Sequence, residues 1–187
     1  MSTGSRRPRA DARRNYERLL AEADSAFRER GTEASLESIA RRAGVAIGTL
    51  YGHFPNRRAL VGALLRDRND ALFAFGERLL AHPSGTEALA DWVRAVVEHA
   101  ATYSGLAAML ANGLDDEASE LHASCVRMAD IGERLITHAR GSGAVRPDVT
   151  GTDVFTLINA AAWVREQTSH EDADRLVRLT LDGLAPR

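Results

Sequence analysis

The positions of proline divide this chain into long segments that favour helices. Prolines occur only at residues 8, 55, 83, 147 and 186, and the runs between them are rich in alanine and leucine. No segment alternates apolar and polar residues with the β-branched residues that strands favour. Apolar residues recur instead at spacings of three and four, which is the period of an amphipathic helix. The sequence therefore predicts an all-α fold without a sheet.

Capping residues and glycines divide these segments into about nine helices. Gly31 and Gly44 are suited to end helices, because glycine adopts the positive φ that follows a helix. Ser35 and Asn56 are good N-caps for the helices that follow them, and Thr86 is the expected cap of the fifth. The expected helices span residues 11–30, 36–43, 46–53, 56–80, 88–103, 105–113, 115–141, 152–168 and 171–184.

The composition is that of an ordinary globular protein, with 44% apolar and 27% charged residues. No run of about eighteen apolar residues is present, so we expect neither a membrane span nor a membrane partner. The basic N-terminal segment has no apolar stretch behind it, which argues against a secretory signal. The single cysteine, Cys125, allows no internal disulfide. We therefore expect a protein of the reducing cytoplasm.

The formal net charge of −2 hides an uneven distribution. Residues 1–60 contain twelve arginines and seven acidic residues, a net charge of +5. Residues 61–187 contain the other twelve arginines and nineteen acidic residues, a net charge of −7. A basic N-terminal third on an acidic body indicates that the first part binds a polyanion. The alternative is an uneven surface charge without a function.

The segment from residue 36 to residue 53 has the pattern of a helix-turn-helix. Ala40 is small where the two short helices cross, and Gly44 can adopt the positive φ of a sharp turn. Ile39, Val45 and Leu50 are apolar and can bury the joint. In such a motif the second helix lies in the major groove of DNA, with its first residues toward the base edges. Any tight helical hairpin could show part of this pattern.

A longer string is more specific. It contains Phe27 with the RERG ending, Ser35, Leu36, Ile39, Ala40, Ala43, Gly44, Val45, Gly48, Thr49, Leu50, Tyr51, His53, Phe54 and Pro55. With these residues, the segment 15–65 resembles the DNA-binding domain of the TetR family of transcriptional regulators. The rest of the chain is similar to the family only in its layout, a divergent helical domain that binds ligands and forms dimers. The expected parts are a flexible basic arm over residues 1–10, the three-helix helix-turn-helix domain over 11–55 and the ligand-binding and dimerisation domain over 56–187.

The resemblance implies roles at DNA for the second helix of the motif. Gly48 and Thr49 match positions near the bases and the backbone, and Tyr51 and His53 match positions that contact phosphates. Arg57 matches a basic residue at the start of the fourth helix, which is a favourable place for a phosphate. The alternatives are a core position for Tyr51 and a helix-end hydrogen bond for His53.

Other positions depart from the family pattern or add to it. Ala46 and Ile47 replace a serine and a lysine that the family often has, so Ala46 cannot cap the recognition helix by its side chain. Ile47 can still touch a thymine methyl group. Ser35 can offer its hydroxyl to a phosphate, and Arg42 adds positive charge. The basic arm over residues 6–9 reaches a flanking minor groove or only aids solubility. The residues expected at DNA are Ser35, Arg42, Ala46, Ile47, Gly48, Thr49, Tyr51, His53 and Arg57.

The resemblance also implies a dimeric regulator with two states. In the family a small molecule enters the helical body and tilts the fourth helix, which changes the separation of the two recognition helices. A repressor released from operator DNA by an unidentified effector is therefore expected, without a cofactor. Each candidate pocket residue could equally be plain core. These candidates are Trp92, Val96, His99, Tyr103, Met109, Cys125, Met128, Asn159 and Trp163.

We expect the homodimer to form through the last two helices, as a four-helix bundle with their symmetry mates. The alternative for these side chains is burial within one protomer. The apolar residues and one threonine expected there are Val154, Leu157, Ile158, Ala161, Ala162, Leu176, Leu179, Thr180 and Leu184.

Other function classes have weaker support in the sequence. A helical enzyme or ligand carrier with an incidental helix-turn-helix is one alternative, and a transcriptional activator with the same fold is another. No phosphate-binding loop or catalytic triad spacing is recognisable, so we expect no enzymatic activity. His122 and Cys125 are three residues apart, but two ligands do not make a metal site. We expect no metal.

Overall fold

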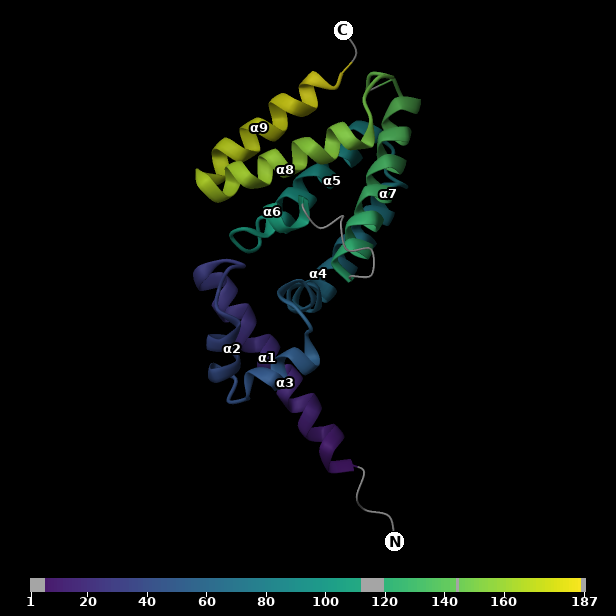
Figure 1. The fold of residues 1–187 in the computed structure, drawn as a ribbon. Helices are drawn as coiled ribbons and strands as arrows, with labels where there is room; N and C mark the ends of the chain where they lie inside the picture. Colours follow the sequence, from purple (N-terminus) through teal and green to yellow (C-terminus); the bar gives the residue numbers. More distant parts are fainter. Residues whose placement is uncertain (1–5, 112–119, 144, 186–187) are drawn as a thin grey trace.

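The computed structural model describes residues 6–111, 120–143 and 145–185, and all regular elements within these ranges are helices (Figure 1). The all-α prediction is therefore confirmed. The helices are α1 (Arg6–Arg30), α2 (Leu36–Arg42), α3 (Ile47–His53), α4 (Arg57–Leu79), α5 (Gly85–Ala100), α6 (Leu106–Ala111), α7 (Glu120–Gly141), α8 (Gly151–Gln167) and α9 (His170–Gly183).

The first three helices form a small unit at the N-terminal end, and α4 leads from it into the larger body (Figure 1). The unit is held by apolar side chains that α1, α2 and α3 bury together. Phe27, Ile39 and Leu50 have no exposed surface, and Phe54 is almost fully buried. Burying such side chains stabilises the unit by about 1.5 to 3 kcal/mol each.

The N-terminal boundary differs from the sequence-based expectation. The flexible arm was expected through residue 10, but α1 already begins at Arg6, so residues 6–10 are helical. Pro8 does not prevent this, because the first turn of a helix has no backbone acceptors for its N–H groups. Residues 1–5 of the expected arm lie outside the described residues.

The start of the fifth helix differs as well. The fifth helix begins at Gly85 and is capped by Ser84, whose side chain accepts a hydrogen bond from the N–H of Glu87. Thr86 was the expected cap, but the helix begins before it, at Gly85, where a Cβ atom would lie 2.7 Å from Ala139 on α7. For the seventh helix the described part starts at Glu120, and the expected residues 115–119 lie outside the described ranges.

In the body, α7 packs against α4 and α5, and α8 packs against α5 and α9. The last two helices lie side by side at the end of the molecule away from the N-terminus (Figure 1). Large apolar residues such as Trp92, Leu106 and Ile131 are fully buried between these layers. None of the described helices is long and apolar enough to cross a membrane.

Candidate DNA-binding face and effector cavity

The turn between α2 and α3 has the geometry that a helix-turn-helix needs. Ser35 caps α2 by accepting a hydrogen bond from the N–H of Ser38, and Gly44 adopts a φ of 67° in the turn. The N–H of Val45 donates to the carbonyl oxygen of Ala40 at 3.0 Å, which closes the turn. Ala40 is buried where the helices meet. These features confirm the predicted motif.

The outward side of α3 is open and uncharged. Leu50 and Phe54 anchor the helix in the core, whereas 46% of the Tyr51 surface is exposed. A Cβ atom added at Gly48 or at Gly52 would meet no other atom within 4 Å. The two glycines therefore do not serve internal packing, and they leave room for another surface to approach the helix closely.

The other expected DNA residues of α2 and α3 lie around this face. Ala46 is exposed and is the N-cap of α3, without a side-chain hydrogen bond. Ile47 and Thr49 are half-buried. Ser35 is exposed at the start of α2, and its hydroxyl donates to the Glu37 carboxylate at 2.9 Å. The hydroxyl therefore already has an internal acceptor.

His53 lies at the end of α3, half-buried against two aromatic rings. Its ring centroid is 5.9 Å from that of Tyr16 on α1, in an edge-on arrangement, and 6.2 Å from that of Phe54. The imidazole is thus positioned by packing at the rim of the open face.

Two arginines that were expected to serve DNA binding make contacts inside the protein. Arg42 donates to the carboxylate of Glu22 at 2.8 Å and to the hydroxyl of Ser25 at 3.0 Å, both on α1. Arg57 donates to two backbone carbonyl oxygens, those of Thr32 and Ala34, in the turn between α1 and α2. In this structure Arg42 holds α2 against α1, and Arg57 holds α4 against the turn between α1 and α2.

A second contact joins the helix-turn-helix unit to the body at the turn between α5 and α6. The Tyr103 hydroxyl donates to the carboxylate of Asp24 on α1 at 2.6 Å. The N–H of Thr32 donates to the carbonyl oxygen of Ser104 at 2.8 Å. Gly105 has a φ of 82°, and a Cβ atom there would lie only 2.6 Å from the Thr32 hydroxyl oxygen. Glycine therefore allows this close contact.

The same turn is also bound to α8. The N–H of Gly105 donates to Oε2 of Glu166 at 2.9 Å, and Glu166 stands near the end of α8. Burial raises the pKa of the Tyr103 hydroxyl above its usual range, and its hydrogen bond to Asp24 adds to this effect. The hydroxyl therefore remains a donor at neutral pH. The α5–α6 turn thus connects α8 with α1.

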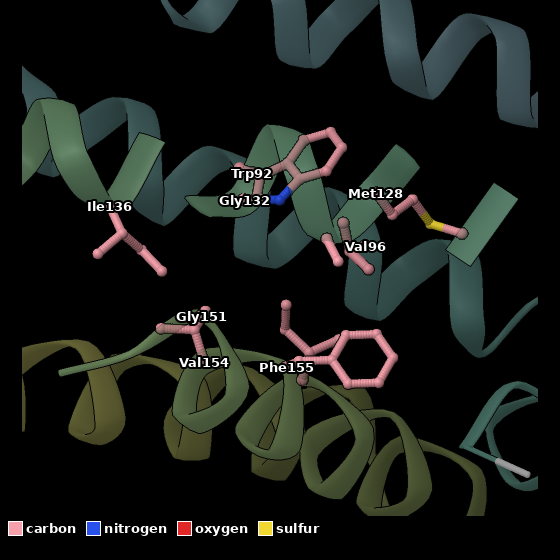
Figure 2. Close-up of a pocket in the computed structure, with 10 residues that line it drawn as sticks. Trp92, Val96, Met128, Gly132, Ile136, Gly151, Val154 and Phe155 are labelled. Atoms are coloured by element: carbon pink, nitrogen blue, oxygen red, sulfur yellow. The ribbon is translucent and has the colours of Figure 1, made fainter. Parts of the chain in front are cut away.

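A small cavity lies where α5, α7 and α8 meet (Figure 2). Its volume is about 20 Å³, which is room for about one water molecule. Trp92 and Val96 reach it from α5, Met128 from α7 and Phe155 from α8. Small-molecule sites are usually several hundred Å³, so the cavity is too small for such a ligand in this structure.

Three of the nine expected ligand residues, Trp92, Val96 and Met128, line this cavity. Phe155 on α8 is also an apolar position that the sequence favours for a pocket. The sequence-based search missed the remaining positions, although they recur at helical spacing: Gly132 and Ile136 follow Met128 at intervals of four on α7, and Gly151, Val154 and Ile158 form a stripe with Phe155 on α8. Glycine at two of these positions hid the stripes from a search for large apolar residues. The full lining is Trp92, Val96, Met128, Ala129, Gly132, Ile136, Gly151, Val154, Phe155 and Ile158.

The other six expected ligand residues lie elsewhere. Tyr103 is in the α5–α6 turn, and Met109 and Asn159 are half-buried on α6 and α8. Trp163 is 58% exposed on α8 and does not face the protein interior. The remaining two residues are buried and are described next.

His99 and Cys125 are buried side chains with shifted pKa values. Burial, together with the positive charge of Arg68, lowers the pKa of His99 to about 4. The imidazole borders an open hollow of about 290 Å³ between α4 and α5. Burial raises the pKa of the Cys125 thiol to about 11, so at neutral pH it is protonated and not a reactive thiolate. Among the described residues no group of three metal-ligating side chains comes together.

Comparisons with known proteins agree with this architecture. Residues 19–64 match the model of the bacterial regulatory proteins of the tetR family. Residues 84–186, more than half of the chain, match the model of the C-terminal domain of SbtR-like transcriptional regulators. The chain belongs to the TetR family. It is a transcriptional regulator, and the α2–α3 unit of this TetR-family chain is its DNA-binding helix-turn-helix.

Solved structures support the same assignment to the TetR family. A TetR transcriptional regulator from Streptomyces coelicolor, SCO0520, is 34% identical over 91% of this chain and 98% of its own, with a TM-score of 0.61. A TetR regulatory protein from Mycobacterium vanbaalenii is also 34% identical, over 95% of this chain and 99% of its own, with a TM-score of 0.55. The regulator FadR from Bacillus subtilis, solved with stearoyl-CoA, shares the fold at 21% identity over 91% of this chain and 97% of its own, with a TM-score of 0.62. No curated protein sequence matches the chain.

The last two helices of this TetR-family chain differ from expectation in which side chains they present. Five of the residues expected at a dimer interface are buried within the protomer. Leu179 on α9, which was expected at the interface, is 60% exposed, and Trp163 on α8, which was not expected there, is 58% exposed. Leu157, Leu176 and Thr180 are half-buried. The five buried residues are Val154, Ile158, Ala161, Ala162 and Leu184.

Proposed function

We propose that the chain is a homodimeric repressor that binds operator DNA in a sequence-specific way and leaves it when a small molecule binds in the body. The observation that carries the proposal is the outward side of α3. Tyr51 is exposed there beside two glycines that face open space. A short helix of this kind, anchored by its opposite side, suits insertion into the major groove of DNA.

At the DNA, α3 supplies shape and hydrogen bonds. Thr49 and Ile47 would approach the bases from the start of the helix, with Ala46 and Gly48 allowing close contact. Tyr51 and His53 would donate to phosphate oxygens, which positions the helix without reading the sequence. Sequence specificity then comes from few direct contacts and from the fit of an uncharged helix into the groove.

The attraction to the phosphate backbone comes from arginines near α3. Arg41 on α2 is exposed and pairs with no other described residue, so its charge is available to DNA. Arg42 and Arg57 make their hydrogen bonds to α1 and to the turn that follows it. We therefore propose that these two residues position α2 and α4 for DNA binding, and that Ser35 acts with them from the start of α2.

The two copies of a homodimer would meet through α8 and α9. Trp163 and Leu179 expose large apolar surfaces on this pair of helices, and exposed side chains of this size are typical of interaction surfaces. The exposed positions Thr156 and Ala160 are small, which would let the helices of the two copies approach closely. A two-fold dimer places two recognition helices about 34 Å apart, in successive major grooves.

The effector site that we propose is the cavity between α5, α7 and α8. A ligand larger than one water molecule must push α8 away from α5 and α7. Because Glu166 ties α8 to the N–H of Gly105, this movement would pull on the turn that holds Thr32. Movement of α4, which packs against α7, is a second route by which the ligand would act on the helix-turn-helix unit. FadR of the same fold was solved with stearoyl-CoA, so a protein with this fold can hold a small molecule.

We propose no enzymatic activity for this chain. The groups with strongly shifted pKa values serve structure: Tyr103 bonds to Asp24, and the Cys125 thiol is buried. A regulator of operator DNA acts in the cytoplasm of a bacterium, which agrees with the single free cysteine.

Binding to DNA can be tested with genomic fragments selected by the purified protein, measured by fluorescence anisotropy over a range of salt concentrations. Tyr51→Ala should weaken binding about tenfold, the effect of losing a hydrogen bond to a charged phosphate, while the fold and the dimer persist. Val126→Ala, also at an exposed apolar residue but on α7, is the matched control. A binding curve without sequence preference or salt dependence would refute the proposal.

A further inference from the structure

The cavity between α5, α7 and α8 has a chemical character that specifies its ligand. None of the side chains that line it carries a charge, and most of them are aliphatic or aromatic. In Figure 2 they converge on the gap between α8 on one side and α5 with α7 on the other. A lining of this kind favours a largely apolar molecule.

One polar group breaks this apolar surface, the indole N–H of Trp92. The side chain is 1% exposed and fits into a notch between two glycines. A Cβ atom at Gly76 would lie 2.6 Å from the indole ring, and a Cβ atom at Gly132 would lie 3.3 Å from Nε1. Because both positions are glycine, the large ring lies in one fixed orientation between α4 and α7.

This orientation leaves Nε1 of Trp92 without an acceptor. Within the described part of the chain, no oxygen or nitrogen accepts a hydrogen bond from it. Figure 2 shows the indole nitrogen on the side of the ring that faces the gap. A donor that faces such an apolar gap gains from a hydrogen bond, and indole donates but cannot accept. A water molecule in the cavity, or an acceptor on a ligand, would satisfy it.

We propose that the effector is an uncharged, largely apolar molecule with one hydrogen-bond acceptor, such as a carbonyl oxygen, which accepts from Nε1 of Trp92. This inference rests on the proposed function and names the ligand class of its effector site. Specificity would come from this donor, because a site built to hydrogen-bond its ligand discriminates against a molecule without the acceptor. The hydrocarbon part would be recognised by burial alone.

The surroundings disfavour an anionic ligand. The lining offers no cation, and an isolated charge is costly to bury. The carboxylate of Glu133 reaches the rim, where its Oε2 would lie 2.3 Å from a Cβ atom on Gly151. Arg140 is the basic partner of Glu133, at 3.8 Å. A second carboxylate in the cavity would therefore meet repulsion without a counter-ion of its own.

Space for such a molecule can come from two side chains of the lining. Met128 is flexible, and thioethers adapt readily to a new shape. Phe155 is half-buried, so its ring can move outward with a small shift of α8. A single ring or a short chain is the size that these movements would admit.

The test uses the indole N–H as its own reporter. The chain has two tryptophans, Trp92 and Trp163, so its ¹H–¹⁵N NMR spectrum contains two indole resonances, which a Trp163→Phe variant assigns. The unmodified protein is then titrated with cyclohexanone, methylcyclohexane and cyclohexanecarboxylate. A parallel series uses 2-heptanone, heptane and heptanoate. Within each series the three probes share a hydrocarbon part and differ in the acceptor and its charge.

The ketones should bind at least tenfold more tightly than the matched hydrocarbons and move the Trp92 resonance. The carboxylates should bind more weakly than the ketones. In Trp92→Phe, checked for its fold by circular dichroism, calorimetry should show that the preference for ketones is lost. If the variant does not fold, the shift of the Trp92 resonance in the unmodified protein decides. Equal binding of ketone and hydrocarbon, tighter binding of carboxylate, an unmoved resonance or no ketone binding overturns the inference.

These outcomes are separate from those of the proposed function. Selective, salt-dependent binding to genomic fragments without ketone binding leaves the repressor proposal intact and removes the ligand class. Ketone binding with the expected preference, in a protein that does not select DNA, supports the ligand class and removes the repressor proposal. Both measurements use the same full-length protein.

Discussion

The burial of His99 should make the folded protein sensitive to mild acid. The side chain is 4% exposed on α5, and its Nε2 makes no hydrogen bond in the structure. Burial, together with the positive charge of Arg68, lowers its pKa from the ordinary value of 6.5 to about 4. The unfolded chain therefore takes up a proton below pH 6.5 that the folded protein resists until about pH 4.

The free energy of unfolding falls over this pH window and is independent of His99 above it, because folded and unfolded states then both hold a neutral imidazole. One pKa unit corresponds to about 1.4 kcal/mol. From the pKa values of 6.5 and about 4, the linkage relation gives a loss of about 2 kcal/mol between pH 7 and pH 5. At pH 4 the loss reaches about 3 kcal/mol. These losses are large fractions of the stability of a typical domain.

The measurement is urea unfolding, followed by circular dichroism at pH 7 and pH 5. His99→Gln removes the titrating group, so its unfolding free energy should fall by about 2 kcal/mol less over this range than that of the unmodified protein. The constant cost of the substitution cancels in the comparison of the two pH values. His170→Gln, at an exposed histidine at the start of α9, is the control. Equal losses in His99→Gln and in the unmodified protein would show that the reasoning about His99 is wrong.

Three further predictions follow from other contacts. Gly31→Ala should lower the unfolding free energy by about 1 to 3 kcal/mol in urea denaturation, because its φ is 72° and its Cβ atom would lie 2.7 Å from a carbonyl oxygen of the α5–α6 turn. Arg41→Gln should reduce the salt dependence of DNA binding by about one phosphate contact. Arg42→Gln should instead lower the unfolding free energy by about 1 kcal/mol, as loss of a part-exposed ion pair does. Equal salt slopes for the two variants would contradict the proposal that Arg41 contacts DNA and Arg42 does not. Leu179→Asp should convert the proposed dimer to monomer in sedimentation analysis, and Val126→Asp, also at an exposed apolar residue, should not.

Much of the fold could be predicted because its signals are local. Ser35, Gly44 and Asn56 act within one turn of the backbone, and all three have the predicted roles of cap or turn residue. The buried sides of α1 to α3 follow from spacings of three and four. Such features need no knowledge of what lies across the molecule, so single positions suffice to reveal them.

The roles of Arg42 and Arg57 could not be predicted because their partners are distant in sequence. Glu22 lies twenty residues before Arg42, and the carbonyl oxygens that bind Arg57 lie in a turn more than twenty residues earlier. In the sequence, an arginine beside a DNA-binding helix is therefore equally consistent with a contact to DNA and with a contact inside the protein. Only the placement of α1 shows that these two side chains are engaged with the protein.

The contacts of α8 are even harder to predict from the sequence, because this helix has apolar or small residues on nearly every side. Periodicity ranks its positions by hydrophobicity but does not say which side meets the cavity, the body or a second copy. In the structure Val154 and Ile158 line the cavity and Trp163 is exposed. The sequence-based expectation was a dimer interface for the first two and a ligand pocket for Trp163. Because one helix bears both the proposed effector wall and the proposed dimer surface, a ligand that moves α8 would act on both at once. Release from DNA would then be coupled to the geometry of the dimer, and not only to the tilt of α4.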